Sequence, residues 1–142
     1  MDGSKNATRA LDAGIKMSKT YGAELFILNV IPTPSILLAA QAGLGVPPVG
    51  AESYYEQEEI DSRHFLEEGV ELAKAQKVTN VSSEAIRATS SIVEEIIDTA
   101  ARKNIDLIVI GTRGVGGFKK LLQGSVSSGV VIHAECNVMV VR

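Results

Sequence analysis

Hydrophobic and polar positions along the chain follow two patterns, one typical of helices and the other of strands. In the first pattern, apolar or small residues recur every three or four positions, which predicts amphipathic helices. The helices expected on this basis span 8–21, 52–76, 92–103 and 125–134. In the second pattern, short and nearly continuous apolar runs predict strands covered on both faces. These runs lie at 25–31, 105–110 and 138–141, while 81–86 alternates as an edge or near-edge strand does.

The expected helices and strands alternate along the whole chain. Such alternation predicts an α/β protein, because parallel strands need crossover helices that then cover both faces of the sheet. We therefore expect one domain over residues 1–142, built as a single open parallel sheet with helices on both faces. Residues 33–51 are rich in proline and glycine and are expected to form a loop.

Local features predict where two of the helices begin, end and bury a face. Gly22 follows the first helical segment and is expected in the left-handed conformation that ends a helix. Ser91 and Glu94 have the spacing of a capping box, in which the serine hydroxyl and the glutamate carboxylate satisfy free N–H groups at a helix start. The buried face of the first helix is expected to carry Leu11, Gly14, Ile15, Ser18 and Tyr21.

A glycine-rich segment follows the apolar run that ends at Ile110. It holds five glycines within the fourteen residues 111–124 and leads into a helical segment at Ser125. Glycine lets the backbone approach a ligand, and a helix N-terminus presents free N–H groups and about half a positive charge. An ordinary turn between strand and helix is the alternative, but a loop this long and polar is usually functional in a compact domain. The segment therefore indicates a phosphate-binding site.

Composition excludes several classes of function. The chain of 142 residues is 45% hydrophobic and 22% charged, with a net charge of −3 and no tryptophan. It lacks both the basic surface and the aromatic platforms with which proteins bind long nucleic acids. Cys136 is the single cysteine, and no Cys/His cluster has the spacing of metal ligands. No apolar run approaches the roughly 18 to 20 residues that cross a bilayer, so we expect a cytoplasmic protein with no membrane partner.

Candidate catalytic groups are not evident in the sequence. No nucleophile with a matched base, and no carboxylate pair positioned for acid–base work, can be picked out. His64, His133 and Cys136 are interpreted as structural residues. We therefore assign no catalytic residue and no protein-held metal ion.

The motifs together resemble the universal stress protein family, specifically its ATP-binding branch. The family signature of glycine, two residues, glycine, nine residues, glycine and serine or threonine is matched by Gly111, Gly114, Gly124 and Ser125. The similarity covers nearly the whole chain, because 2–4, 21–25 and 106–111 resemble, respectively, the turn after the family's first strand, the entry to its second strand and its fourth strand. The resemblance implies a Rossmann-like fold of the adenine nucleotide alpha hydrolase-like type.

The resemblance also implies which residues bind ATP with Mg²⁺ or Mn²⁺. Asp2 would lie by the ribose and adenine, and Val30 and Ile31 would line the adenine pocket. A second group at the end of the next apolar strand would approach the ribose and phosphates: Ile110, Gly111, Arg113 and Gly114. A third group would give N–H and hydroxyl donors to the phosphates: Gly124, Ser125, Val126 and Ser127. Arg113 is also compatible with an ordinary solvated loop arginine.

The chain departs from the family pattern at two places. The family's chain opens with an apolar strand in the middle of the sheet, but only Met1 precedes the Asp2 turn here. The usual first strand is thus missing from this chain. Either the chain given starts late, or the sheet has a gap, a partner's strand or a register change. Asn137 also stands where the family usually has proline, which adds one N–H donor.

Three functions follow from these expectations. The first is an ATP-binding universal stress protein that acts as a nucleotide-dependent regulatory module in a stress response. The second is a slow ATPase that uses the same site. The third is an interaction module that binds no nucleotide. The resemblance further implies a homodimer through the last strand, Val138 to Val141, whose short apolar edge could pair with its copy.

Overall fold

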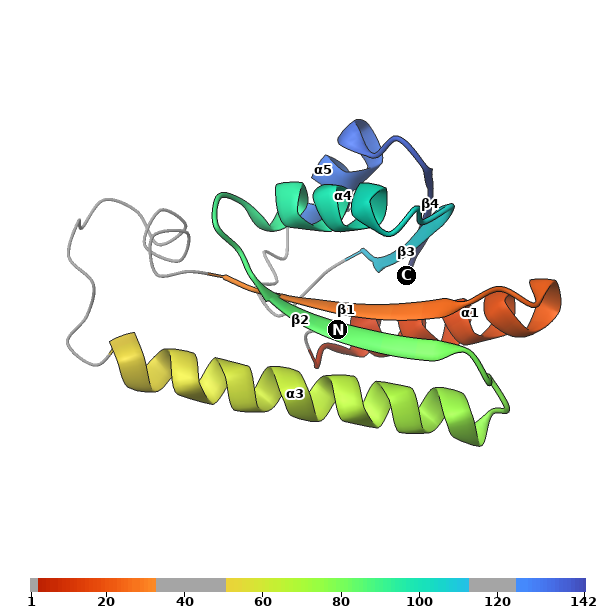
Figure 1. The fold of residues 1–142 in the computed structure, drawn as a ribbon. Coiled ribbons are helices and arrows are strands. Elements are labelled where there is room, and N and C mark those ends of the chain that lie inside the picture. Colours follow the sequence, from red (N-terminus) through yellow and green to blue (C-terminus); the bar gives the residue numbers. More distant parts are fainter. Residues whose placement is uncertain (1–2, 33–50, 113–124) are drawn as a thin grey trace.

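The computed structural model describes residues 3–32, 51–112 and 125–142 as four helices and four strands in alternating order. Figure 1 shows their arrangement. The elements are α1 (Lys5–Tyr21), β1 (Leu25–Ile31), α3 (Ala51–Ala75), β2 (Val81–Arg87), α4 (Ile92–Arg102), β3 (Leu107–Gly111), α5 (Ser125–His133) and β4 (Asn137–Val141). Each element expected from the sequence within these ranges is therefore present. The loop expected at 33–51 lies outside the described residues, except that Ala51 begins α3.

The first helix shows where local prediction succeeds and where it misses. Gly22 ends α1 with φ of 65°, the left-handed conformation expected of it. The helix begins at Lys5 rather than near residue 8, because the Ser4 side chain accepts a hydrogen bond from the Ala7 N–H at 3.1 Å and caps the first turn. Tyr21 was expected on the buried face, but it is 72% exposed. That part of the prediction is wrong, since the helix already passes the end of the core at its last turn.

The strands form two parallel pairs, β1 with β2 and β3 with β4. Helices α1 and α3 cover one face of this layer, and α4 and α5 cover the other (Figure 1). The α/β architecture with parallel strands agrees with the sequence-based expectation. The single continuous sheet does not appear, because no ladder joins the two pairs within the described residues.

The buried core lies between β1 and the two helices on one face. It is made of aliphatic side chains that were spaced at helical intervals in the sequence or alternated along a strand. Its members are Leu11, Ile15, Ile27, Leu66, Ala73 and Val78. Their burial holds α1 and α3 firmly against β1, which fixes the position of the first turn of α1.

The start of α4 confirms one half of the capping box. The Ser91 hydroxyl accepts a hydrogen bond from the Glu94 N–H at 3.1 Å, as expected. The carboxylate that ties down the preceding loop belongs to the next residue, Glu95, which accepts bonds from the Thr89 N–H at 2.9 Å and the Thr89 hydroxyl at 2.7 Å. The carboxylate role assigned to Glu94 is therefore wrong. These two bonds lower the pKa of Glu95 below its ordinary value of 4.5, because they favour the charged carboxylate.

Candidate functional site

The candidate site is the edge of the strand layer at which β1 and β3 end. Both strands run toward the same side of the molecule, as Figure 1 shows. Val30 and Ile31 are the last residues of β1, and Ile110 and Gly111 are the last residues of β3. Ligands of open α/β sheets bind outside the carboxyl ends of their strands. The fold therefore brings these four predicted site residues to the edge where a ligand is expected.

The first turn of α1 lies directly against the end of β3. A Cβ atom added to Gly111 would lie 2.8 Å from the carbonyl oxygen of Asn6. No such contact is possible in a relaxed structure, and the neighbour is main chain that cannot rotate away. Glycine at 111 is thus required for the close approach of α1, in addition to any approach of a ligand.

The first turn of α5 is tied to the same place. The Ser127 side chain is buried, with 2% exposed, and its hydroxyl donates a hydrogen bond to the Thr112 carbonyl at 3.3 Å. Ser125, the first residue of the helix, is exposed, and Val126 is half-buried. The Ser127 hydroxyl was predicted as a donor to phosphate, but its proton is directed to Thr112 in this structure. The start of α5 is therefore fixed beside the end of β3.

Two helix N-termini consequently meet at the end of β3. Neither α1 nor α5 carries an acidic residue in its first turn, whereas α4 carries Glu94 and Glu95 in the same position. The aligned peptide dipoles give each helix start a partial positive charge. In α4 that charge is balanced by the helix's own carboxylates. In α1 and α5 no carboxylate of the first turn balances it, so an anion between them is favoured.

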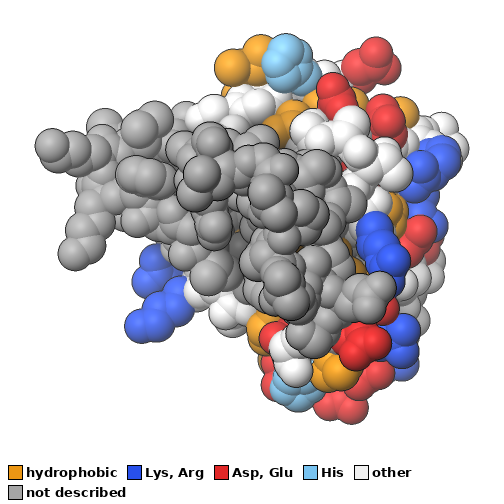
Figure 2. Space-filling view, turned by 90° about the vertical axis from the view of Figure 1, so that its left-hand side faces the viewer, with side chains coloured by type: hydrophobic (Ala, Val, Ile, Leu, Met, Phe, Trp, Pro, Cys, Tyr) orange, Lys and Arg blue, Asp and Glu red, His pale blue; other side chains and the backbone are white. Residues whose placement is uncertain are grey.

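Four of the predicted site residues fall on parts of the chain that the structure leaves undescribed. They are Asp2, Arg113, Gly114 and Gly124. Their roles stay predictions. Figure 2 views the molecule from this edge, and the coloured side chains on this face mix basic and acidic groups rather than forming a patch of one sign.

Sequence reasoning missed two residues that shape the edge. Asn6 packs its main chain on Gly111, and Thr112, which is 7% exposed, anchors both neighbouring elements. The Thr112 N–H donates to the Val141 carbonyl at 2.8 Å, while its own carbonyl accepts from Ser127. Ser4 could have indicated that Asn6 lies in the first turn of a helix, because a serine ahead of a helical pattern indicates an N-cap. Nothing in the sequence pattern distinguished Thr112 from other loop residues.

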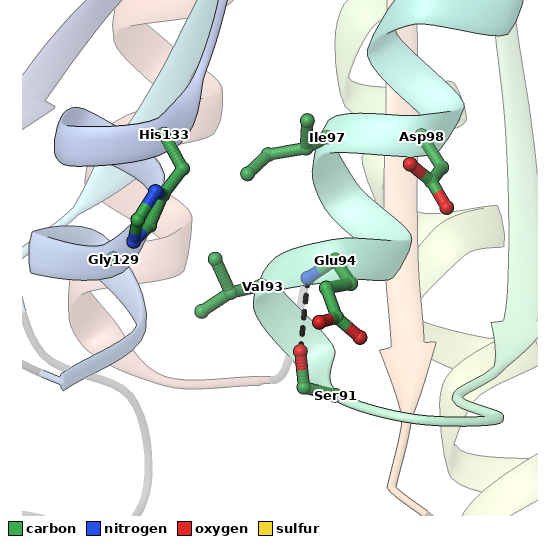
Figure 3. Close-up of a pocket in the computed structure, with 7 residues that line it drawn as sticks. All are labelled: Ser91, Val93, Glu94, Ile97, Asp98, Gly129 and His133. Carbon is green, nitrogen blue, oxygen red and sulfur yellow. Dashed lines mark hydrogen bonds between the residues drawn. The ribbon is translucent and has the colours of Figure 1, made fainter.

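A hollow lies between α4 and α5, away from the candidate site (Figure 3). Its volume is about 420 Å³, and it is lined by Ser91, Val93, Glu94, Ile97, Asp98, Gly129 and His133. The two helices approach closely at Gly129, where an added Cβ would lie 2.8 Å from a Val93 methyl carbon. None of the predicted nucleotide-binding residues lines this hollow.

Within the described ranges, no group of three or more His, Cys, Asp or Glu residues is placed to hold a metal ion. None of the helices in those ranges is both long enough and apolar enough to span a bilayer.

The parallel strands, the covering helices and the helix starts at one strand edge define the chain as a Rossmann-like α/β protein. The model of the universal stress protein family matches residues 1–142. The chain belongs to this family. Among its relatives, the universal stress protein YxiE of Bacillus subtilis is 34% identical over an alignment of 143 residues that covers 100% of this chain and 95% of the relative.

Solved structures agree with this fold. The universal stress protein UspA from Lactobacillus plantarum superimposes with a TM-score of 0.84 at 23% identity, over 100% of this chain and 93% of that chain. A universal stress protein from Archaeoglobus fulgidus in complex with dAMP superimposes with a TM-score of 0.71 at 16% identity, over 100% of this chain and 92% of that chain. At these identities the similarity establishes the fold.

Proposed function

We propose that this protein binds ATP at the carboxyl edge of β1 and β3 and acts as a nucleotide-dependent regulatory module in a stress response. The observation that carries the proposal is the meeting of two helix N-termini, those of α1 and α5, beside Gly111 and Thr112. Both first turns lack acidic residues, so the site offers positive potential that the triphosphate would neutralise. The dAMP complex of the Archaeoglobus fulgidus relative supports an adenine nucleotide as the ligand class.

The roles of the described residues follow from their places. At the end of β1, Val30 is half-buried and has aliphatic surface that suits an adenine ring, whereas Ile31 is 4% exposed and would support that surface from beneath. Ile110 and Gly111 border the ribose and phosphates, and the start of α5, at the exposed Ser125 and the half-buried Val126, supplies N–H donors. Ser127 holds α5 in position through Thr112, so we assign its hydroxyl to positioning rather than to phosphate contact.

The remaining roles rest on the family resemblance. Asp2 would contact the ribose and adenine, and Arg113, Gly114 and Gly124 would surround the phosphates. Mg²⁺ or Mn²⁺ would enter with the nucleotide, since phosphate oxygens and water are the usual ligands of Mg²⁺ beside such sites. We assign no catalytic residue. Occupancy of the site would act by changing how the protein contacts its partners, including a second copy bound through β4.

A charge placed at the start of α5 tests the proposal. Ser125→Glu adds a carboxylate where the phosphates would lie, yet a carboxylate in the first turn favours the helix itself. We expect the affinity for ATP with Mg²⁺, measured by calorimetry, to fall roughly tenfold or more, because like charges then meet at the site. The melting temperature should stay the same or rise, which separates a binding effect from unfolding.

Ser82→Glu is the matched control. Ser82 is exposed near the amino end of β2, at the edge of the layer opposite the candidate site, so the same charge there should leave affinity unchanged. Small molecules released from the denatured protein should include an adenine nucleotide in their mass spectrum. Absence of ATP binding at millimolar nucleotide would refute the proposal, as would equal loss of affinity in both variants.

A further inference from the structure

The hollow between α4 and α5 opens to solvent, because these two helices pack side by side on the outside of the strand layer (Figure 1). Its volume of about 420 Å³ lies within the range of ligand-binding pockets. No part of the proposed nucleotide site belongs to it. We call this hollow the α4/α5 groove, and it is lined by Ser91, Val93, Glu94, Ile97, Asp98, Gly129 and His133.

The α4/α5 groove has an apolar wall. Val93 and Ile97 are half-buried and point from α4 toward α5, as Figure 3 shows. Gly129 faces them from α5, where an added Cβ would lie 2.8 Å from a Val93 methyl carbon. Glycine at 129 therefore lets the two helices approach each other and adds no side chain that would fill the groove. Aliphatic surface thus stays open between the helices.

An exposed isoleucine extends this apolar surface along α5. Ile132 follows Gly129 by three residues, so the two lie on neighbouring parts of one helix face. Ile132 is 72% exposed, and no large apolar residue in the described ranges is more exposed. A single exposed aliphatic side chain is ordinary, but one that continues an apolar groove with a polar rim indicates an interaction site.

The α4 side of the groove is negatively charged. Glu94 and Asp98 are both exposed and lie four residues apart, so their carboxylates share one helix face, about 6 Å apart along its axis. Within the described part of the chain, neither carboxylate accepts a hydrogen bond or forms an ion pair. Two like charges at this spacing repel each other, and the chain as a whole has a net charge of −3. A cationic partner would relieve this repulsion.

We propose that the α4/α5 groove docks an amphipathic basic helix of a different protein. Aliphatic side chains of that helix would contact Val93, Ile97 and Ile132, and lysines or arginines four residues apart would pair with Glu94 and Asp98. A helix suits the groove because it satisfies its own backbone hydrogen bonds, whereas a strand would find no strand edge between two helices. A second copy of this chain is the poorer occupant, since a two-fold contact through this face would bring the same carboxylates to both sides.

Fluorescence anisotropy with the nucleotide-free, full-length protein tests this docking, so its result does not depend on whether the protein binds ATP. The probe is a labelled peptide of about eighteen residues, long enough to form a helix, with leucines along one face and lysines four residues apart beside them. It should bind the protein, and its affinity should fall as salt is added, because salt screens exposed charges. The same peptide with glutamates in place of the lysines, or with a central proline that breaks the helix, should not bind.

A pair of double variants tests the two carboxylates. Glu94→Gln with Asp98→Asn removes both negative charges of the groove, so the peptide should bind roughly three- to thirtyfold more weakly at low salt. Glu67→Gln with Glu71→Gln is the matched control. It removes the same charge from two exposed residues with the same spacing on α3, which lies on the opposite face of the strand layer (Figure 1), so the affinity should stay unchanged.

A second pair tests the apolar contact. Ile132→Ser should weaken peptide binding by roughly threefold or more, because an aliphatic contact is lost, while an unchanged melting temperature shows that the fold survives. Ile60→Ser is its control, since Ile60 is 60% exposed on α3, away from the groove. Four results would overturn the proposal: no binding at millimolar peptide, equal binding of the glutamate peptide, equal losses in the α3 variants, or a protein dimer that Ile132→Ser dissociates. The last result would assign the groove to a second copy.

Discussion

The main chain of α1 leaves no room for a side chain at position 111, whether or not a ligand approaches Gly111. Gly111→Ala would place a Cβ atom 2.8 Å from the Asn6 carbonyl oxygen, and relief requires movement of the helix. We expect a loss of about 2 to 3 kcal/mol of unfolding free energy in urea denaturation. Gly22→Ala is the comparison, since that Cβ meets open space and only the φ of 65° opposes it. Its expected cost is about 1 kcal/mol. Equal costs at the two positions would contradict the packing role of Gly111.

Ser127 and Tyr21 show that the hydrogen-bond partner and the burial of a single residue cannot be predicted from sequence spacing alone. A serine at a helix start can donate a hydrogen bond to a phosphate or to the protein. Only the tertiary position of Thr112 determines that the Ser127 hydroxyl bonds within the protein. Tyr21 fitted the helical spacing of the buried face, yet the last turn of α1 extends beyond the core, and Tyr21 is 72% exposed. Val30, Ile31 and Ile110 were placed correctly at strand ends, because strand boundaries follow from local patterns, whereas Gly111 was placed in the loop and is the last residue of β3.

The helix α4 and the loop before it depend on one carboxylate. Glu95 accepts two bonds from Thr89, and these lower its pKa in the folded protein. A lowered folded pKa means that this stabilisation is fully present above the ordinary pKa of 4.5 and is lost as the pH falls through the lower folded value. Glu95→Gln should therefore cost about 0.5 to 1 kcal/mol near pH 7, where solvent weakens the bonds, and less as the pH falls below 4.5.

Glu94→Gln is the control for this prediction. Glu94 is exposed, and its N–H rather than its carboxylate makes the capping bond to Ser91. Urea denaturation at pH 7 and at pH 3 should show a pH-dependent difference for Glu95→Gln alone. A constant difference across this range would mean that the charge of Glu95 does not stabilise the loop.

Helices and strands were predicted from the sequence more completely than individual side-chain contacts were. The apolar run of β1 matched its observed bounds, Leu25–Ile31, because a buried strand must be apolar throughout. The start of α1 was placed late, since its first turn is polar and only the Ser4 cap marks it. Glu95 rather than Glu94 accepts the hydrogen bonds from Thr89. Which carboxylate lies near Thr89 depends on where β2 ends, and the spacing of apolar residues does not predict that.

Across the whole molecule, the outer edge of β4 is an edge of the strand layer that no other described strand covers. Asn137 and Val141 bond to the β3 side, so Val138 and Val140 direct their backbone groups outward. This edge is short and apolar. Two copies related by a two-fold axis could join it antiparallel and extend the layer. The homodimer that we propose would therefore leave the helix starts of α1 and α5 accessible.

Val140→Pro tests this dimer. Proline removes the outward N–H of residue 140, while the ladder with β3 uses the N–H groups of its neighbours, so the fold should survive and pairing of the edges should fail. Sedimentation at tens of micromolar protein should give a dimer for the native chain and a monomer for Val140→Pro. Val140→Thr keeps both the N–H and the branched side chain and should stay dimeric. A native chain that sediments as a monomer, or a Val140→Pro dimer of unchanged affinity, would exclude β4 as the interface. Because the charge at Ser125 acts at a different edge, Ser125→Glu should weaken ATP binding without changing the sedimentation of the nucleotide-free protein.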